Sequence, residues 1–291
     1  MTFLCCSPMP ANLSPLRVAL LQYDIAWCDP DANFERIRTM LPAPGSVDVL
    51  LLPEAFSTGF ATPLAREVAA RSAQAVDFLT ALASELQCAV GASVFVPHSS
   101  GKVANRFFWV EPDGTTTTAD KRHLFAVAGE HRDFERGTEA VVVTWRGWRL
   151  RLAVCFDLRF PVWLRNTLDA GGTPAYDGLL VVANWPEARE NAWTTLLAAR
   201  AMENQCYVAG VNRVGVDGFG VDHSGASRII GPWGDVLASA DEHKSVLVTA
   251  EWDPTHLAAV RKRFPFLADQ DPFAVLGMPP EATGALTSNP L

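Results

Sequence analysis

The segment RLRLAVCFDLRFP, residues 149–161, contains the change of pattern on which the fold prediction rests. Apolar residues alternate and then run continuously up to Cys155, and a charged, aromatic and proline-bearing stretch follows at once. A strand that leads into a turn presents one side chain at the edge of a sheet. Cys155 is therefore either a nucleophile or a buried structural thiol.

Strands and helices alternate on both sides of this segment. Apolar periodicity and turn residues predict the following elements in the first half: strands over 16–22, 47–56 and 88–96, and helices over 32–41 and 63–86. The second half repeats the order with strands over 149–157, 177–185 and 206–214, and helices over 161–168 and 191–205.

Short internal matches support the repeat. LQCAVGASV at 86–94 resembles NQCYVAGVN at 204–212, and VDVLLLPEAF at 47–56 resembles YDGLLVVANW at 176–185. Two βαβαβ halves without a Gly/Ser linker predict one α/β domain, a four-layer α-β-β-α sandwich. Asp113-Gly114 and Arg146-Gly147 indicate hairpins that add antiparallel strands, and further strands are expected within 227–240 and 245–253. The predicted limits are an N-terminal extension over 1–14, the domain over 15–267 and an irregular tail over 268–291.

Composition excludes several classes of function. The 291 residues carry a formal net charge of -8 and no basic stripe, which argues against nucleic acid as a partner. No apolar run approaches the roughly 18 residues of a membrane helix, and no signal peptide is recognisable, so we expect a cytoplasmic protein without membrane contact. The six cysteines form no CxxC pair and no zinc spacing. We therefore expect reduced thiols and no metal.

Polar residues stand where predicted strands end. Glu54, Cys155 and Asn184 each follow a strand, and Lys121 follows a hairpin. A thiol, a carboxylate and an ammonium are sufficient for cysteine-dependent amide hydrolysis, because they supply the nucleophile, the proton carrier and the oxyanion donor. Taken alone, Lys121 fits a solvated polar loop equally well.

These residues and their flanks resemble a known family. LLLPEAFSTGF around Glu54, DKRHLF around Lys121 and AVCFDLRFPVWLRN around Cys155 are similar, in this order, to the nitrilase or carbon-nitrogen hydrolase superfamily. CFDLRFPVWLRN, VANWPEAR and ARAMENQCYVAGVNRVG look most like the omega-amidases within it. The resemblance implies the sandwich fold and a dimer formed through the helices that follow Cys155 and Asn184. It also implies an amidase that releases ammonia from 2-oxoglutaramate or 2-oxosuccinamate.

The resemblance also implies roles for individual residues. Cys155 is the nucleophile that forms a thioester, Glu54 is the general base and acid, and Lys121 donates to the oxyanion together with the backbone N–H of Phe156. Glu130 occupies the place of a second family glutamate, which positions Lys121 and the substrate amide. The expected substrate-binding residues are Phe125, Phe156, Arg159, Asn184 and Trp185. No cofactor is expected.

Alternatives remain for the outer residues and for the activity. Glu130 could pair with Arg132 or Arg136, and Arg159 could either clamp a substrate carboxylate or tie Asp157 to the scaffold. The aromatic residues could be ordinary core. Another amidase of the superfamily, acting on deaminated glutathione, an N-carbamoyl compound or an aliphatic amide, is the alternative function, and an inactive binding scaffold is a further one.

Overall fold

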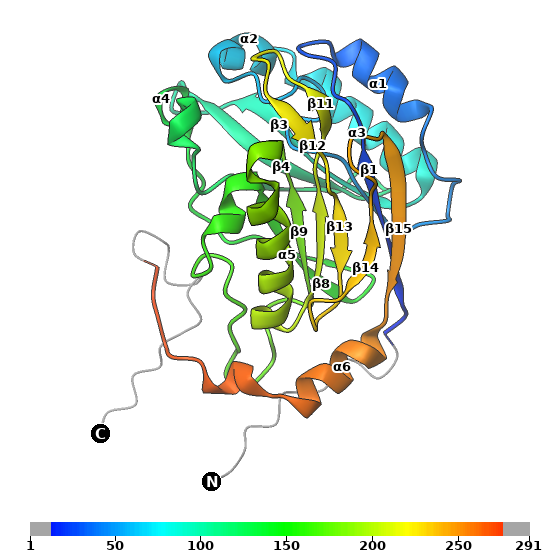
Figure 1. Cartoon of the computed structure of the whole chain (residues 1–291), viewed down its shortest axis with the longest axis vertical. Helices are drawn as coiled ribbons and strands as arrows, with labels where there is room; N and C mark the ends of the chain where they lie inside the picture. Colours follow the sequence, from blue (N-terminus) through cyan, green and yellow to red (C-terminus); the bar gives the residue numbers. More distant parts are fainter. Residues whose placement is uncertain (1–12, 276–291) are drawn as a thin grey trace.

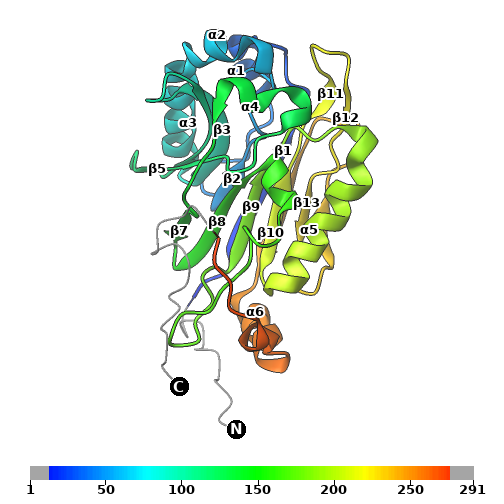
Figure 2. The same ribbon diagram turned by 90° about the vertical axis from the view of Figure 1, so that its left-hand side faces the viewer.

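Two β-sheets lie face to face at the centre of the molecule, and helices cover their outer faces (Figure 1). The computed structural model describes residues 13–275. Seen from the side, α3 (Ser72–Leu86) lies outside the first sheet and α5 (Glu190–Asn204) outside the second (Figure 2). The predicted α-β-β-α sandwich is confirmed.

The first sheet takes its strands mainly from the first half of the chain. Its order is β15 (Val246–Trp252), β1 (Leu16–Gln22), β2 (Val49–Leu51), β3 (Ala89–Pro97), β4 (Val103–Val110) and β5 (Thr116–Asp120), with the short β6 (Phe134–Glu135) beside β4. The central strands β1, β2 and β3 are parallel, whereas β15, β4 and β5 pair antiparallel with their neighbours.

The second sheet repeats this plan. Its order is β14 (Val236–Ser239), β13 (Arg228–Ile230), β10 (Tyr207–Val211), β9 (Gly178–Val182), β8 (Trp148–Val154) and β7 (Val142–Trp145). Strands β8, β9 and β10 are parallel, and the other three are antiparallel to their neighbours. A separate hairpin joins β11 (Val214–Val216) to β12 (Asp222–Ser224). Because the two sheets match strand for strand, β1 corresponds to β8 and β2 to β9.

The remaining helices are short. They are α1 (Pro30–Arg38), α2 (Ala65–Ala69), α4 (Glu130–Asp133) and α6 (Pro254–Arg263), with 3₁₀ turns η1 (Thr62–Leu64), η2 (Ala126–Ala128), η3 (Cys155–Arg159), η4 (Glu187–Arg189) and η5 (Phe266–Asp269). Helix α1 begins two residues before the predicted start at 32, because the Asp29 side chain accepts from the Ala32 N–H and proline takes the first helical position.

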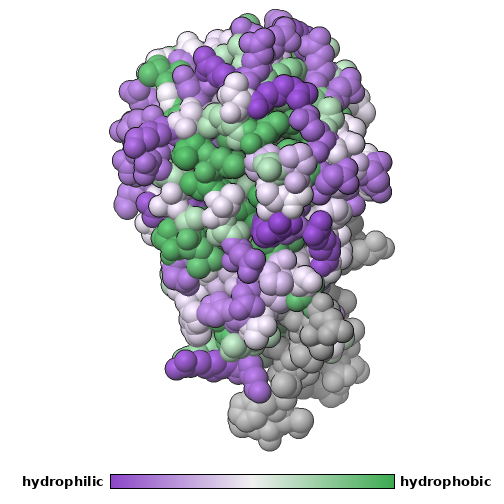
Figure 3. Space-filling model, turned by 90° about the vertical axis from the view of Figure 1, so that its right-hand side faces the viewer, coloured by the Kyte–Doolittle hydropathy of each residue, from purple (hydrophilic) through white to green (hydrophobic). Residues whose placement is uncertain are grey.

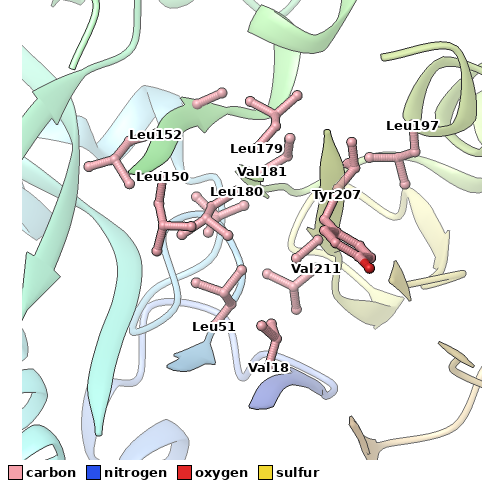
Figure 4. Close-up of a cluster of buried hydrophobic side chains, with 14 of the residues drawn as sticks. Val18, Leu51, Leu150, Leu152, Leu179, Leu180, Val181, Leu197, Tyr207 and Val211 are labelled. Atoms are coloured by element: carbon pink, nitrogen blue, oxygen red, sulfur yellow. The ribbon is translucent and has the colours of Figure 1, made fainter. Parts of the chain in front are cut away.

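The main core lies between the sheets and continues beneath α5. Val18 and Leu51 of the first sheet lie opposite Leu150 and Leu180 of the second, all fully buried (Figure 4). Leu197 of α5 belongs to the same cluster. A second apolar cluster fills the space between the first sheet and helices α1 and α3. Burial of apolar side chains on both faces explains why the parallel strands read as continuous apolar runs.

Both predicted hairpins are present. Strands β4 and β5 are joined through Asp113-Gly114, where Gly114 has φ +87°. Strands β7 and β8 are joined through Arg146-Gly147, where both residues have positive φ. Positive φ at both central residues is the mark of the tight turn that matches strand twist.

Two helix predictions need correction. The helix expected over 63–86 is broken near Arg71, because α2 packs on a small cluster with Phe95 and Phe134 while α3 packs on the larger core. The helix expected over 161–168 is wrong, since the backbone there forms turns and irregular structure. Asn166 explains the difference: its side chain donates to the carbonyls of Tyr176 (3.0 Å) and Asn204 (2.9 Å), contacts that a local helix would not make.

The outermost strands β14 and β15 lie next to each other on one side of the sandwich. Hydrophobic residues gather in the middle of that side (Figure 3). In β14, Val236 and Leu237 are 50% and 40% exposed. Because β15 and β14 are the edge strands of their sheets, both sheets have an open edge on this side. No helix among residues 13–275 is long and apolar enough to cross a bilayer.

The predicted ends of the domain are only partly covered. Residues 1–12 and 276–291, with Cys5 and Cys6, lie outside the described residues. The predicted boundary at 267 falls inside η5, whose Leu267 is fully buried.

Candidate active site

The carboxyl ends of β2, β8 and β9 meet at one end of the sandwich and border a cavity of about 520 Å³. Glu54, Lys121, Cys155 and Asn184 all line this cavity. The structure therefore brings together side chains that lie up to 130 residues apart in the sequence. Sites beyond the carboxyl ends of parallel strands are typical of α/β folds.

Cys155 lies at the first position of η3, directly after β8. Its φ is +44°, a left-handed value that side chains other than glycine adopt only under constraint. The constraint comes partly from Asp157, whose Oδ2 accepts the Val154 N–H at 3.2 Å. The thiol is 9% exposed, and its Sγ is 3.8 Å from the carbonyl oxygen of Asn184. A sharp turn after a strand thus presents the sulfur to the cavity.

Lys121 lies between two carboxylates. Its Nζ is 2.9 Å from Glu54 Oε1 and 3.0 Å from Glu130 Oε2, and all three side chains are at most 1% exposed. The solvated-loop interpretation of Lys121 is therefore wrong. Glu130 pairs with Lys121 and makes no ion pair with Arg132 or Arg136.

Two asparagines hold Glu54. Asn105 Nδ2 donates to Glu54 Oε1 at 2.7 Å and lies 3.5 Å from Glu130 Oε1. The Asn184 backbone N–H donates to Glu54 Oε2 at 2.9 Å, and its side chain donates to the Glu54 carbonyl. Asn105 was not predicted as a site residue. It lies in VANRFFWV of β4 next to Arg106, and the structure shows it to be fully buried.

Burial controls the charge of this cluster. Burial alone would lower the pKa of Lys121, but the carboxylates of Glu130 and Glu54 outweigh it and hold that pKa above its usual range. Burial raises the pKa of Cys155 well above its usual value, and the Glu54 carboxylate adds to the shift while Lys121 opposes it. Burial also raises the pKa of Glu130. The free thiol therefore holds its proton at neutral pH.

The predicted substrate-binding residues line the same cavity. They are Phe125, Phe156, Arg159, Asn184 and Trp185. Arg159 does not tie Asp157 to the scaffold: its guanidinium lies over the Trp185 ring, 4.7 Å from the centroid. Asp157 instead accepts from the backbone N–H of His123 at 2.9 Å and contacts its ring Nδ1 at 2.8 Å. Trp185 thus belongs to the core as well as to the cavity wall, whereas Phe125 and Phe156 are half-buried and line the cavity.

Further cavity residues escaped sequence analysis. The Lys121 ammonium lies 4.8 Å from the ring centroid of Phe60, and Arg189 lies 5.3 Å from that of Phe125. Both are cation–π contacts. Phe60 and Arg189 end the segments LLLPEAFSTGF and VANWPEAR, but the sequence assigned them no role, because their contacts join separate loops. Across residues 13–275, no three His, Cys, Asp or Glu side chains are grouped to hold a metal ion.

Comparison with known proteins gives consistent matches. The profile of the carbon-nitrogen hydrolase family matches residues 17–262. Omega-amidase YafV of Escherichia coli (strain K12) is 44% identical over 258 residues, covering 89% of this chain and 98% of that protein. The 2-oxoglutaramate amidase of Bacillus subtilis (strain 168) is 33% identical over 257 residues, covering 87% and 96%.

A solved structure agrees with the sandwich fold. XC1258 from Xanthomonas campestris, a CN-hydrolase superfamily protein with an arsenic adduct in its active site, matches with a TM-score of 0.87 and 39% identity, covering 90% of this chain and 99% of that one. Fold and matches together define a hydrolase that acts on carbon–nitrogen bonds of amides. The chain belongs to the carbon-nitrogen hydrolase, or nitrilase, superfamily, and its predicted similarity to omega-amidases is confirmed.

Proposed function

We propose that this protein is an omega-amidase that hydrolyses the terminal amide of 2-oxo dicarboxylic monoamides such as 2-oxoglutaramate and 2-oxosuccinamate. The observation that carries the proposal is the buried Glu54–Lys121–Glu130 cluster beside Cys155 in one cavity. The names of the relatives from Escherichia coli and Bacillus subtilis support the substrate class.

In the proposed mechanism, Cys155 attacks the amide carbon. Because its thiol is protonated in the free enzyme, Glu54 takes the proton as the new carbon–sulfur bond forms. The carbonyl oxygen becomes an oxyanion, which accepts from Lys121 and from the backbone N–H of Phe156. Phe156 is the second residue of η3, where N–H groups have no acceptor within the helix.

Collapse of the tetrahedral intermediate breaks the carbon–nitrogen bond. Glu54 returns its proton to the leaving nitrogen, ammonia departs, and the acyl group remains on Cys155 as a thioester. Glu54 then takes a proton from water and the hydroxyl adds to the thioester carbon. As the carbon–sulfur bond breaks, Glu54 gives this proton to the leaving sulfur. The products are the 2-oxo acid and the restored thiol.

Glu130 acts in this scheme by holding Lys121. The Glu130 carboxylate is fully buried and contacts the Lys121 ammonium. It also accepts a hydrogen bond from the Phe125 N–H. In the free enzyme Lys121 is thereby held between two anions, which raise its pKa above its usual range and keep it charged. Arg159, supported on Trp185, is placed to bind the substrate carboxylate, and Phe125 and Asn184 border the acyl chain.

The test is ammonia release from 2-oxoglutaramate by the wild type and by Cys155→Ala. We expect turnover to fall by roughly 10⁴-fold or more in the variant, because a missing nucleophile removes the covalent pathway. Cys206→Ala is the matched control, since Cys206 is fully buried outside the cavity, and it should keep its activity. Equal activity of wild type and Cys155→Ala would refute the thioester mechanism. Activity only on aliphatic or N-carbamoyl amides would refute the substrate class.

We also propose a homodimer formed through the α5 side. Met202 on α5 is 46% exposed, and near it lie Trp233 (43%) and Phe264 (53%), whose rings are 5.8 Å apart. Exposed aromatic and methionine side chains in one patch are typical of interfaces. Met202→Asp should give monomers in sedimentation analysis, and a monomeric wild type would contradict the proposal. A cytoplasmic location stays a prediction.

A further inference from the structure

Three arginines line the cavity, and none of them has an ion pair within residues 13–275. They are Arg132, Arg159 and Arg189. The buried Arg261, by contrast, pairs with Asp177 at 2.6 Å. Unpaired guanidinium groups around a cavity are available to an anionic ligand.

Arg189 is held both through its backbone carbonyl and through its guanidinium group. Its carbonyl oxygen accepts from Trp185 Nε1 at 2.8 Å, and its guanidinium lies over the Phe125 ring. Phe125 in turn donates its backbone N–H to the buried Glu130 carboxylate. The cation is therefore tied through Phe125 to the cluster around Lys121, although its side chain reaches the solvent-exposed rim.

The arginines determine where the cavity can accept an anion. Two carboxylates, Glu54 and Glu130, face one ammonium, Lys121, so this buried cluster by itself has more negative than positive charge. Asp217 also lines the cavity, and its Oδ1 accepts two backbone N–H groups, at 2.8 Å and 3.0 Å. The three arginines more than offset these negative charges, so a substrate carboxylate is best accommodated beside them.

We propose that Arg189 is a specificity residue, which binds the carboxylate of an anionic amide substrate at the cavity rim together with Arg159. This inference rests on the proposed function and adds the second cation to its substrate site. A planar guanidinium matches a carboxylate with two parallel hydrogen bonds, and the aromatic face beneath it leaves its N–H edge free. Arg132 is less suited, because no ring supports it among the described residues.

The experiment measures steady-state kinetics of Arg189→Met and Arg189→Lys with three amides of one chain length: 2-oxoglutaramate, glutaramate and pentanamide. The last lacks the carboxylate. For Arg189→Met we expect kcat/KM to fall about 10-fold for both acids, mainly through KM, and to change less than about twofold for pentanamide. Arg189→Lys keeps the charge and should lose about threefold.

A matched control and a second measurement complete the design. Arg263→Met removes an exposed arginine on α6, away from the cavity, and should leave all three substrates unaffected. The inhibition constant of the product 2-oxoglutarate should rise about 10-fold in Arg189→Met, a readout that does not depend on pentanamide turnover.

The outcomes separate the two proposals. Unchanged kinetics and inhibition in Arg189→Met would overturn the role of Arg189 while leaving the omega-amidase proposal intact. An equal loss on pentanamide would show that Arg189 only shapes the loop, and would also overturn it. Failure of the wild type to release ammonia from either acid would instead reject the proposed function.

Discussion

Two buried polar clusters occupy corresponding strand ends in the two sheets, and they differ in charge. Gln22 ends β1, and Cys155 directly follows the matching strand β8. Around Gln22 every partner is neutral: Ser227 donates twice to Oε1, and Nε2 donates to the carbonyls of Asp241 (2.8 Å) and Lys244 (3.0 Å). Around Cys155 stand two carboxylates and an ammonium.

The two clusters also differ in completeness. The four hydrogen bonds of Gln22 satisfy its amide, and Gly225 closes over it, since a Cβ there would lie 2.3 Å from Gln22 Cδ. By contrast, Oδ1 of Asn105 and of Asn184 find no hydrogen-bond partner within residues 13–275, and the cluster opens into the cavity. A network in which every buried polar group is hydrogen-bonded stabilises the fold. Unpaired polar atoms beside a cavity indicate instead a site that can bind a ligand.

The connection after each strand accounts for the difference. In the first half, helix α1 follows β1 and covers the sheet. In the second half, the helix expected over 161–168 is absent, and the short turn η3 leaves Cys155 facing the cavity. The second half thus has no α-helix between β8 and β9, and the turn after β8 leads directly to the cavity wall.

The largest effect is expected when the charged cluster loses its cation. Lys121→Met should lower kcat about 100- to 1,000-fold, because the oxyanion loses a donor. It should also destabilise the protein by about 3–5 kcal/mol, since two buried carboxylates are left unpaired. Ammonia release and urea unfolding measure the two effects.

The double variant Lys121→Met/Glu130→Gln separates them. Removing one carboxylate should restore much of the stability without restoring turnover, because the oxyanion donor is still missing. A Lys121→Met protein as stable as the wild type would contradict the charge balance inferred for the cluster.

A smaller effect is expected from Asn105→Ala. Asn105 touches Glu54 and comes within 3.5 Å of Glu130, so its loss should loosen the base and lower kcat about 10-fold with little change in KM. Steady-state kinetics at saturating and at low substrate concentrations measure the effects on kcat and on KM separately. A change in KM alone would show that Asn105 binds substrate and does not position Glu54.

The neutral cluster should behave in the opposite way. Gln22→Leu removes four hydrogen bonds and takes the acceptor from the Ser227 backbone N–H and the amide donor from the carbonyls of Asp241 and Lys244, so we expect a loss of about 1–3 kcal/mol in urea unfolding. Turnover per folded molecule should stay within about threefold of the wild type, since Gln22 does not line the cavity. A loss of kcat comparable to that of Asn105→Ala would contradict the inference that the Gln22 cluster serves stability and not catalysis.

The sequence revealed the half of the site that depends on strand ends. Glu54, Cys155 and Asn184 could be placed because the carboxyl ends of parallel strands meet, and the order of the trio matched a family. Asn105 could not be placed, since its importance arises from a contact with Glu54, 51 residues away.

The fold prediction failed where distant contacts decide local structure. The apolar pattern of PVWLRNTL resembles a helix, but Trp163 and Leu164 are buried by tertiary packing, and Asn166 bonds to Asn204 across 38 residues. Arg189 escaped for the same reason, because its partner Phe125 belongs to another loop. The residues that line the cavity from loops were therefore the hardest to predict.

The smallest effect concerns the proton of Cys155. Its raised pKa predicts no thiolate signal in the ultraviolet difference spectrum of wild type minus Cys155→Ala between about pH 7 and 9. The unfolded thiol ionises near its usual pKa of about 8.5, so its difference spectrum in denaturant should show the step there. Because the folded thiol holds its proton longer, its contribution to stability is complete below that pH and is lost as the pH rises beyond it. A thiolate step in the folded protein near neutral pH would mean that Lys121 outweighs burial, and Glu54 would then have no proton to accept during attack.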